Sequence, residues 1–368
     1  MMASFAQFGN ELYSGKRSYD IVGRRRRWFM ISAVLLLLSV VLLLTRGLNP
    51  GIEFRGGSEF MISGTAITDQ QPAHDALAEV APTQEARVST VGTNAVRVQT
   101  EELTDEETTE LRELLAEAYE VDVNDVTASF VGPTWGQSVT NKALRGLVIF
   151  LVLVTVVMAL YFRRWTMAAG ALVALLHDLV ITVGLYAGVG FEVTPATVIG
   201  FLTILGYSLY DTVVVFDKVR ENTEGVLDQS RYTYAEAANL AVNQTLVRSI
   251  NTSVLAVLPV ASILFVGAFL LGAGTLRDIA LALFIGMVVS TASSVFIAAP
   301  VEVALRGRNP AVREHTEKVM AARERRAAEA AASGEDPEAA LADARPGGLV
   351  AGAHLGQRAQ PRRKRQRR

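Results

Sequence analysis

The chain has 368 residues, of which 50% are hydrophobic and 20% charged, and its mean hydropathy is +0.29. This hydropathy is too high for an ordinary soluble protein and indicates a membrane protein. The formal net charge is only −2, and the absence of cysteine excludes disulfides, thiolate metal sites and cysteine nucleophiles. Since the sequence also contains no P-loop, nucleophile elbow or metal motif, we expect neither enzymatic activity nor a cofactor.

The first apolar segment follows a run of four arginines. Arg24–Arg27 precede the apolar run Trp28–Thr45, which is longer than the apolar core of a typical signal peptide. The residues at its end, Leu44–Gly47, contain no small-residue cleavage site. We therefore expect residues 1–27 in the cytoplasm and an uncleaved signal-anchor helix over residues 28–46.

A soluble domain is expected next, over residues 47–140. It carries 17 acidic residues against four arginines and no lysine, a net charge of −13. Thr104 and Glu107 have the spacing of a capping box at the start of its second helix. The βαββαβ order predicts a ferredoxin-like α+β domain. Its acidity fits either a solvated surface or a face that meets an unfolded or basic polypeptide. The elements are expected at β Ser58–Ile62, α Asp69–Val80, β Arg87–Val91, β Ala95–Thr100, α Asp105–Tyr119 and β Asp125–Val131.

Residues 141–305 contain five further apolar segments long enough to cross a bilayer. Basic residues flank them at Arg163-Arg164-Trp165, within Lys218–Arg248 and after Arg306, whereas the turns Gly190–Glu192 and Gly272–Gly274 contain none. The positive-inside rule then predicts six spans with both termini in the cytoplasm. The five spans are expected at Ala143–Phe162, Met167–Val189, Pro195–Phe216, Ile250–Leu271 and Leu276–Ala299.

The last segment, residues 306–368, is rich in Ala, Arg and Glu and is expected to be a cytoplasmic tail. Residues Glu314–Ala332 favour a helix, and the composition from Ser333 onward is typical of disorder. The end, PRRKRQRR, would suit anionic lipid headgroups or ribosomal RNA. A solvated tail is the simpler interpretation, and we expect no specific nucleic acid as partner.

The most unusual residue is Asp211, a single carboxylate inside the apolar stretch Thr194–Phe216. A charged side chain at the centre of a bilayer costs about 2.5–3.5 kcal/mol on insertion scales, so such residues are rare unless they are paired, protonated or used. Arg248 begins the predicted fifth span at a comparable depth, and its long stem could reach Asp211. The pair is either part of a proton-driven cycle, in which Arg248 swings away, or a fixed buried salt bridge that orders the bundle.

Four further polar residues lie near these two. His177 and Asp178 fall at the centre of the third span, Ser208 lies one turn before Asp211, and Asn251 follows Arg248. Each either lines a proton or ion pathway or simply bonds neighbouring helices together. We take all six residues as the candidate pathway. The sequence leaves both H⁺ and Na⁺ open as the coupling ion, because a lone carboxylate serves either.

Several blocks in this order and spacing closely resemble the SecF family, accessory subunits of the bacterial Sec protein translocase. The resemblance extends from about Arg24 to Pro300. Two positions depart from the common family pattern: Tyr210 stands where Asn is usual, and Ser58 where Thr is frequent. The blocks are NPGIEFRGGSEF, VGPTWGQ, LLHDLVIT, TPATVIGFLTILGYSLYDTVVVFDKVREN, NQTLVRSINTS and GAGTLRDIALALFIGMVVSTASSVFIAAP.

The resemblance implies an α-helical polytopic membrane protein, a six-helix RND-like half-bundle with the ferredoxin-like domain inserted on the extracytoplasmic side. It implies a protein of the bacterial plasma (inner) membrane that works with SecD, the SecYEG channel, membrane lipids and secreted preproteins in transit. Such a protein uses the proton-motive force in late steps of export, with Asp211 and Arg248 at the family's proton-path positions. Two alternatives stay open: a structural subunit that stabilises a translocon without ion coupling, and an RND-type small-molecule exporter.

Overall fold

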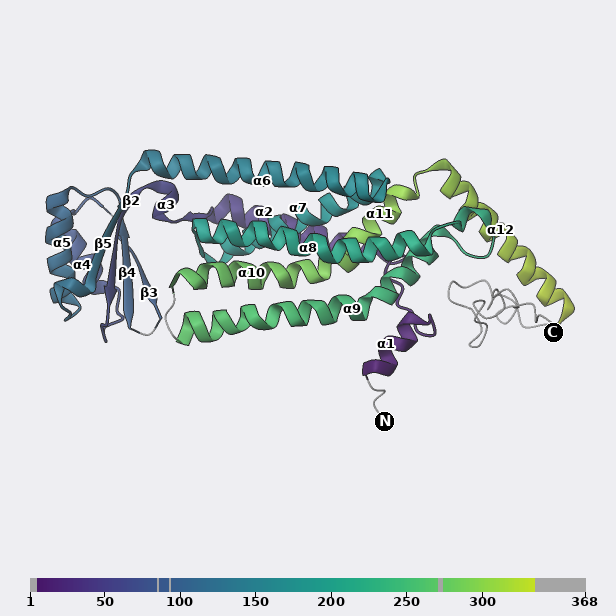
Figure 1. The fold of residues 1–368 in the computed structure, drawn as a ribbon, viewed down its shortest axis with the longest axis horizontal. Helices are drawn as coiled ribbons and strands as arrows, with labels where there is room; N and C mark the ends of the chain where they lie inside the picture. The colour runs from purple at the N-terminus through teal and green to yellow at the C-terminus, as the bar shows by residue number, and fades with distance from the viewer. Residues whose placement is uncertain (1–4, 85, 93, 271–273, 335–368) are drawn as a thin grey trace, which may run out of the picture. The chain divides into compact units, whose positions relative to one another are not determined.

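Figure 1 shows the computed structural model of the chain, which describes residues 5–84, 86–92, 94–270 and 274–334. The described residues form two compact units, one within Arg24–Phe216 and Arg248–Glu302 and one within Met1–Gly23, Asp217–Val247 and Val303–Arg368. The helices are α1 (Phe5–Tyr13), α2 (Arg25–Arg46), α3 (Ile52–Arg55), α4 (Gln71–Val80), α5 (Asp105–Ala118), α6 (Pro133–Phe162), α7 (Trp165–Val189), α8 (Pro195–Asn222), α9 (Tyr234–Ser262), α10 (Gly274–Ser293), α11 (Ala299–Arg306) and α12 (Pro310–Ser333), with 3₁₀ turns η1 (Val123–Asp125) and η2 (Val226–Asp228) and π-helical segments η3 (Ile263–Leu270) and η4 (Ser294–Ala298). The strands are β1 (Asn49–Pro50), β2 (Gly57–Ser63), β3 (Arg87–Val91), β4 (Ala95–Thr100), β5 (Val126–Val131) and β6 (Glu192–Val193).

Six helices of the described chain are long and apolar enough to cross a membrane, which confirms the expected number. Within this bundle α7 packs against α2, α6 and α10. The approach of α8 to α10 depends on Gly200, where an added Cβ would lie 2.7 Å from the Cβ of Ala282. The close packing of small residues is how helices associate in a bilayer, where burial against lipid gives little driving force.

The α+β domain has the predicted ferredoxin-like topology. Its four strands are antiparallel in the order β3-β4-β2-β5, and α4 and α5 lie together against one face of the sheet (Figure 1). Strand alternation puts Phe60 and Val98, which face each other in the register, into the core. The predicted capping box is also present: Thr104 Oγ1 accepts from the N–H of Glu107, and the Glu107 carboxylate accepts from the N–H of Thr104.

A glycine turn joins α2 to this sheet through β1 and α3. Gly56 and Gly57 have φ values of +84° and +131°, which residues with a side chain rarely adopt. A Cβ on Gly57 would also collide with the carbonyl oxygen of Thr100, and one on Gly136 of α6 would lie 2.7 Å from the carbonyl oxygen of Phe54. The turn therefore needs glycines so that α3 can lie directly against α6.

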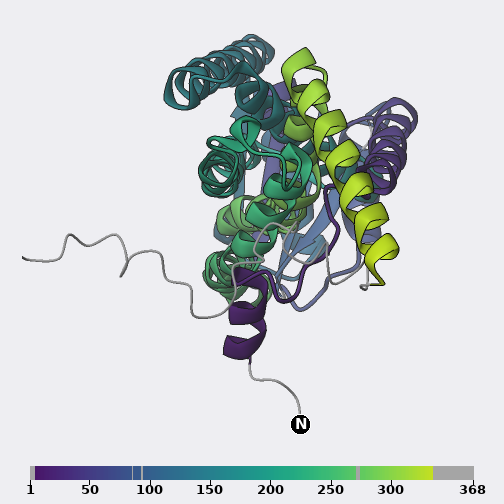
Figure 2. The same cartoon turned by 90° about the vertical axis from the view of Figure 1, so that its right-hand side faces the viewer.

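The other unit contains α1, the start of α9, η2 and α12. The side-chain carbonyl of Asn239 accepts hydrogen bonds from the N–H groups of Ile21 and Val22. Arg323 of α12 pairs with Glu236 of α9 at 2.7 Å. Figure 2 shows α12 as one continuous helix, which confirms the helix expected over Glu314–Ala332.

The segment Lys218–Arg248 and the C-terminal tail differ in how far the structure describes them. The connection Lys218–Arg248 is mostly helical, since α8 continues to Asn222 and α9 already begins at Tyr234, after the Thr233–Glu236 capping box. The expected disorder beyond Ser333, with the basic end PRRKRQRR, falls mainly on residues 335–368, outside the described residues. The expected end of the fifth span at Leu271 and most of the turn Gly272–Gly274 lie outside them as well.

Candidate functional site

Asp178 is the centre of a buried polar cluster between three membrane helices. It lies on α7 and is 0% exposed. The hydroxyls of Ser208 on α8 and Ser293 on α10 each donate to its Oδ2 at 2.7 Å. The ring Nδ1 of His177 lies 3.1 Å from Oδ1. Three polar contacts on one carboxylate compensate much of the solvation that it loses on burial.

Asp211 on α8 is buried as well, with 3% of its surface exposed, but its surroundings are poorer. Its Oδ2 accepts a hydrogen bond from the hydroxyl of Ser294. No cation pairs with it among the residues that the structure describes. A buried carboxylate with a single donor is poorly compensated when it is ionised, and binding of a proton or a cation relieves that cost.

The two carboxylates are bridged by adjacent serines of the last span. Ser293 ends the α-helical part of α10 and bonds Asp178, whereas Ser294 opens the π-helical segment η4 and bonds Asp211. Neighbouring residues on an α-helix point about 100° apart, so one pair of serines can serve carboxylates on two different helices. π-helical turns inside α-helices are frequent at functional sites.

The predicted pair of Asp211 with Arg248 is not formed. Arg248 is exposed, and so is Asn251 one turn further along α9. Leu255 and Leu258 lie on the same outward face, at 70% and 59% exposure. The depth of the two residues suggested contact, but the rotation of α9 places Arg248 and Asn251 on an exposed face. The structure thus brings together Asp178, His177 and Ser208, places Asp211 beside them through the two serines, and leaves Arg248 and Asn251 on an outer face.

The sequence reasoning missed Ser293 and Ser294. The signal was present, because Ser290, Thr291, Ser293 and Ser294 put four hydroxyls within five residues of an otherwise apolar span. Polar side chains in a membrane helix usually face the bundle interior. The reasoning also placed Ser208 beside Asp211, whereas its hydroxyl bonds Asp178.

Six membrane-length helices that enclose two carboxylates, with a ferredoxin-like domain inserted after the first, define a multi-pass membrane protein of the transport type. Residues 110–308 match the family model of the protein export membrane protein SecD/SecF, C-terminal, and residues 41–60 match the SecD/SecF GG motif. The chain belongs to the SecF family of protein translocase subunits and so has a role in protein translocation.

Individual relatives agree with this assignment. The chain is 45% identical to the protein translocase subunit SecF of Streptomyces coelicolor over 92% of this chain and 89% of that protein. It is 43% identical to SecF of Mycobacterium tuberculosis over 85% of this chain and 73% of that protein. The crystal structure of SecDF from Thermus thermophilus, described as a translocon-associated membrane protein, superposes with a TM-score of 0.71 at 31% identity. That match covers 79% of this chain but only 39% of the longer SecDF chain.

Proposed function

We propose that this chain works with a SecD-type partner and the SecYEG channel, and uses the proton-motive force to promote late steps of preprotein export across the bacterial plasma membrane. Both termini lie in the cytoplasm and the α+β domain lies outside. The role is not enzymatic. The observation that carries the proposal is Asp211, a carboxylate buried in an apolar bundle with one hydrogen-bond donor among the described residues.

Two features support ion coupling over a static role. A structural carboxylate is expected to be fully paired, as Asp178 nearly is, because unpaired buried charge is costly. Asp211 is not paired in this way, since Ser294 is its one hydrogen-bond donor among the described residues. Adjacent serines of the last span also bond the two carboxylates, Ser293 to Asp178 and Ser294 to Asp211.

The outer face of α9 supports a partner in the membrane. Arg248 and Asn251 are exposed within a helix that is otherwise apolar on this side. An arginine that faces lipid is costly, so a protein surface is expected to cover it. The single chain of the matched protein is named SecDF, which supports a SecD-type half as that surface.

The test is export of a secretory reporter in a depletion strain that carries Asp211→Asn at wild-type expression. Asparagine keeps the size of the side chain and can accept the bond from Ser294, but it carries no titratable proton. We expect precursor to accumulate while the variant still copurifies with its partner. Normal export would instead favour the structural-subunit alternative.

The same assay identifies the coupling ion and separates the remaining alternative. Collapse of the proton gradient at a constant sodium gradient is expected to slow wild-type export. Collapse of the sodium gradient at a constant proton gradient is expected to leave export unchanged. If only the sodium gradient matters, Asp211 binds Na⁺. An RND-type exporter would show drug sensitivity on depletion without any accumulation of precursor.

A further inference from the structure

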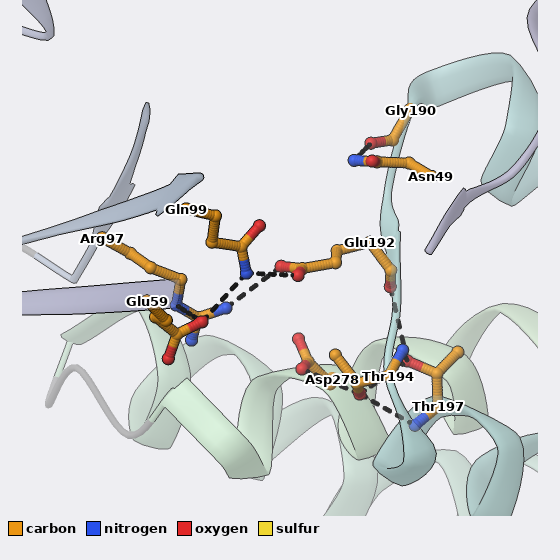
Figure 3. Close-up of polar contacts among 9 residues, drawn as sticks. All are labelled: Asn49, Glu59, Arg97, Gln99, Gly190, Glu192, Thr194, Thr197 and Asp278. Carbon is orange, nitrogen blue, oxygen red and sulfur yellow. Dashed lines mark hydrogen bonds and ion pairs between the residues drawn. The ribbon is translucent and has the colours of Figure 1, made fainter. Parts of the chain in front are cut away.

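The short loop between α7 and α8 contacts the α+β domain directly (Figure 3). Glu192, in β6, receives hydrogen bonds from two side chains of β4, Arg97 Nη1 at 3.1 Å and Gln99 Nε2 at 2.6 Å. Arg97 and Gln99 lie on the sheet face opposite to the core helices, since they alternate with the buried Val96 and Val98. Glu192 therefore joins the domain to the membrane bundle by one ion pair and one further hydrogen bond.

The same loop is also joined to the ends of two membrane helices. At the start of α8, the backbone N–H of Thr194 donates to the hydroxyl of Thr197 at 3.2 Å. The Thr194 hydroxyl donates to Asp278 Oδ2 of α10 at 3.1 Å, and the Thr197 hydroxyl donates to the carbonyl of Glu192 (Figure 3). Movement of Glu192 must therefore pull on α8 and α10 together.

These two helices are the ones that carry Asp211 and Ser294. Asp278 and Ser294 are 16 residues apart on α10, and Pro195 and Asp211 are 16 residues apart on α8. At 1.5 Å per residue both distances are about 24 Å. Hydrogen bonds thus join α8 and α10 at two places, through Thr194 and Asp278 at one end and through Asp211 and Ser294 further along. A shift of one helix against the other at the loop would therefore change the Ser294–Asp211 bond.

A second carboxylate provides a comparison within the same cluster. Glu59 of β2 also accepts from Gln99, at 2.9 Å, and lies 3.8 Å from Arg97 Nε. It is a neighbour of Gln99 in the sheet, so its bonds stay inside the domain. The bonds of Glu192, in contrast, join the sheet to the loop that begins α8.

We propose that Glu192 is a positioning residue that couples the α+β domain to α8 and α10, so that displacement of the domain alters the hydrogen bond between Ser294 and Asp211. This inference rests on the proposed function, because it gives the extracytoplasmic domain a mechanical route to the buried carboxylate of Asp211. Through the bonds of Glu192, displacement of the domain would change ion binding at Asp211. By the same bonds, ion binding at Asp211 would displace the domain.

The test compares Glu192→Ala with the matched control Glu59→Ala in the full chain, assembled with its partner in lipid nanodiscs. Asp211 is labelled with a hydrophobic carbodiimide, which reacts with protonated buried carboxyls, and the label is measured by mass spectrometry across a pH series. Glu192→Ala is expected to move the midpoint of labelling by about one pH unit, the effect of gaining or losing a hydrogen bond to a carboxylate. Glu59→Ala is expected to leave it unchanged.

A second readout reports the mechanical link itself. Spin labels on the sheet and on α8 give a distance distribution, which is expected to broaden in Glu192→Ala and to stay narrow in Glu59→Ala. Glu192→Gln keeps an acceptor for Arg97 and Gln99. Its labelling midpoint and its distance distribution are expected to be close to those of the wild type, and this result would exclude a folding defect as the cause of the alanine effect. Equal effects of the two alanine variants, or none from Glu192→Ala, overturn the inference. Export blocked by Asp211→Asn in that case would leave the proposed function standing.

Discussion

Asp178 and Asp211 are both buried carboxylates of the same bundle, but they have different hydrogen-bond partners. Asp178 has polar contacts with Ser208, Ser293 and His177, whereas Asp211 has a hydrogen bond from Ser294 alone among the described residues. Buried polar groups that lose their partner cost about 1–3 kcal/mol each. The stability of the bundle should therefore depend on Asp178 more than on Asp211.

Asp178→Ala is expected to lower the stability of the bundle by about 1–3 kcal/mol, because it removes the acceptor of the Ser208 and Ser293 hydroxyls and the contact with His177 Nδ1. Asp211→Asn is expected to change stability little while it blocks export. Thermal unfolding of the purified chain in detergent measures both. A larger loss of stability in Asp211→Asn would contradict this division.

Glu53, in the glycine turn outside the membrane, gives a pH-dependent prediction. Burial raises its pKa above the ordinary value of 4.5, and the nearby carboxylates of Glu192 and Glu59 add to the rise, opposed by a backbone hydrogen bond and Arg97. The folded chain thus holds this proton more tightly than the unfolded chain does. The stability that it contributes is complete below pH 4.5 and is lost as the pH rises through the raised pKa.

Glu53→Gln, which is neutral at every pH, is expected to avoid this loss. Its melting temperature should exceed that of the wild type at pH 7.5, and the gap should close as the pH approaches 4.5. The comparison needs only unfolding curves of both proteins at several pH values. A gap that is constant with pH would show that Glu53 does not titrate with a raised pKa.

At the scale of elements, two departures from regular backbone geometry matter: a turn with positive φ angles and a π-helical segment. The turn at Gly56-Gly57 lets α3 reach α6, and the π-helical segment η4 starts at the serine that bonds Asp211. The sequence predicted the strands of the α+β domain almost to the residue, because alternation, turn residues and the Thr104–Glu107 cap are local signals. It did not predict η4, because a π-helical turn depends on packing against α7 rather than on residue preferences.

Gly57→Ala is expected to destabilise the chain by about 1–3 kcal/mol, because its positive φ is strained for alanine and its Cβ would meet the carbonyl of Thr100. Gly64→Ala is the matched control, with a φ of +77° but open space around the new Cβ. The measurement is the melting temperature of each variant. Gly57→Ala is expected to melt at a clearly lower temperature than Gly64→Ala.

Ser294→Ala is expected to alter the pH dependence of export, since it removes the one donor that Asp211 has among the described residues. Ser293→Ala should have a weaker effect, because Asp178 keeps Ser208 and His177. Export rates in inverted vesicles across a pH series distinguish the two. Identical pH profiles for Ser294→Ala and the wild type would argue against a role of Ser294 in the ion step.

At the scale of the whole molecule, one six-helix bundle exposes polar residues where lipid would otherwise lie. Arg248 and Asn251 are on the outer face of α9, whereas the exposed residues of α2 between Met30 and Leu44, such as Leu37, are apolar. The face of α9 is therefore the place where a second half of the transporter is expected.

Since the chain has no native cysteine, this expectation can be tested by site-specific cross-linking. A photoreactive group on Asn251→Cys is expected to capture the SecD-type partner in native membranes, and one on Leu37→Cys is expected to capture lipid. Capture of the partner from position 37 with none from position 251 would place the interface on the opposite side.

By itself, the sequence determined the six spans, the topology of the α+β domain and the placement of Asp178 and Asp211 inside membrane-length helices. Apolar length, strand alternation and the cost of a carboxylate in hydrocarbon are properties of each segment alone. Only the tertiary structure decided that Ser293 and Ser294 serve the carboxylates, that Arg248 turns away from Asp211, and that Glu192 holds the domain. These contacts depend on how each helix is rotated about its axis, and that rotation is set by the packing of neighbours distant in the chain.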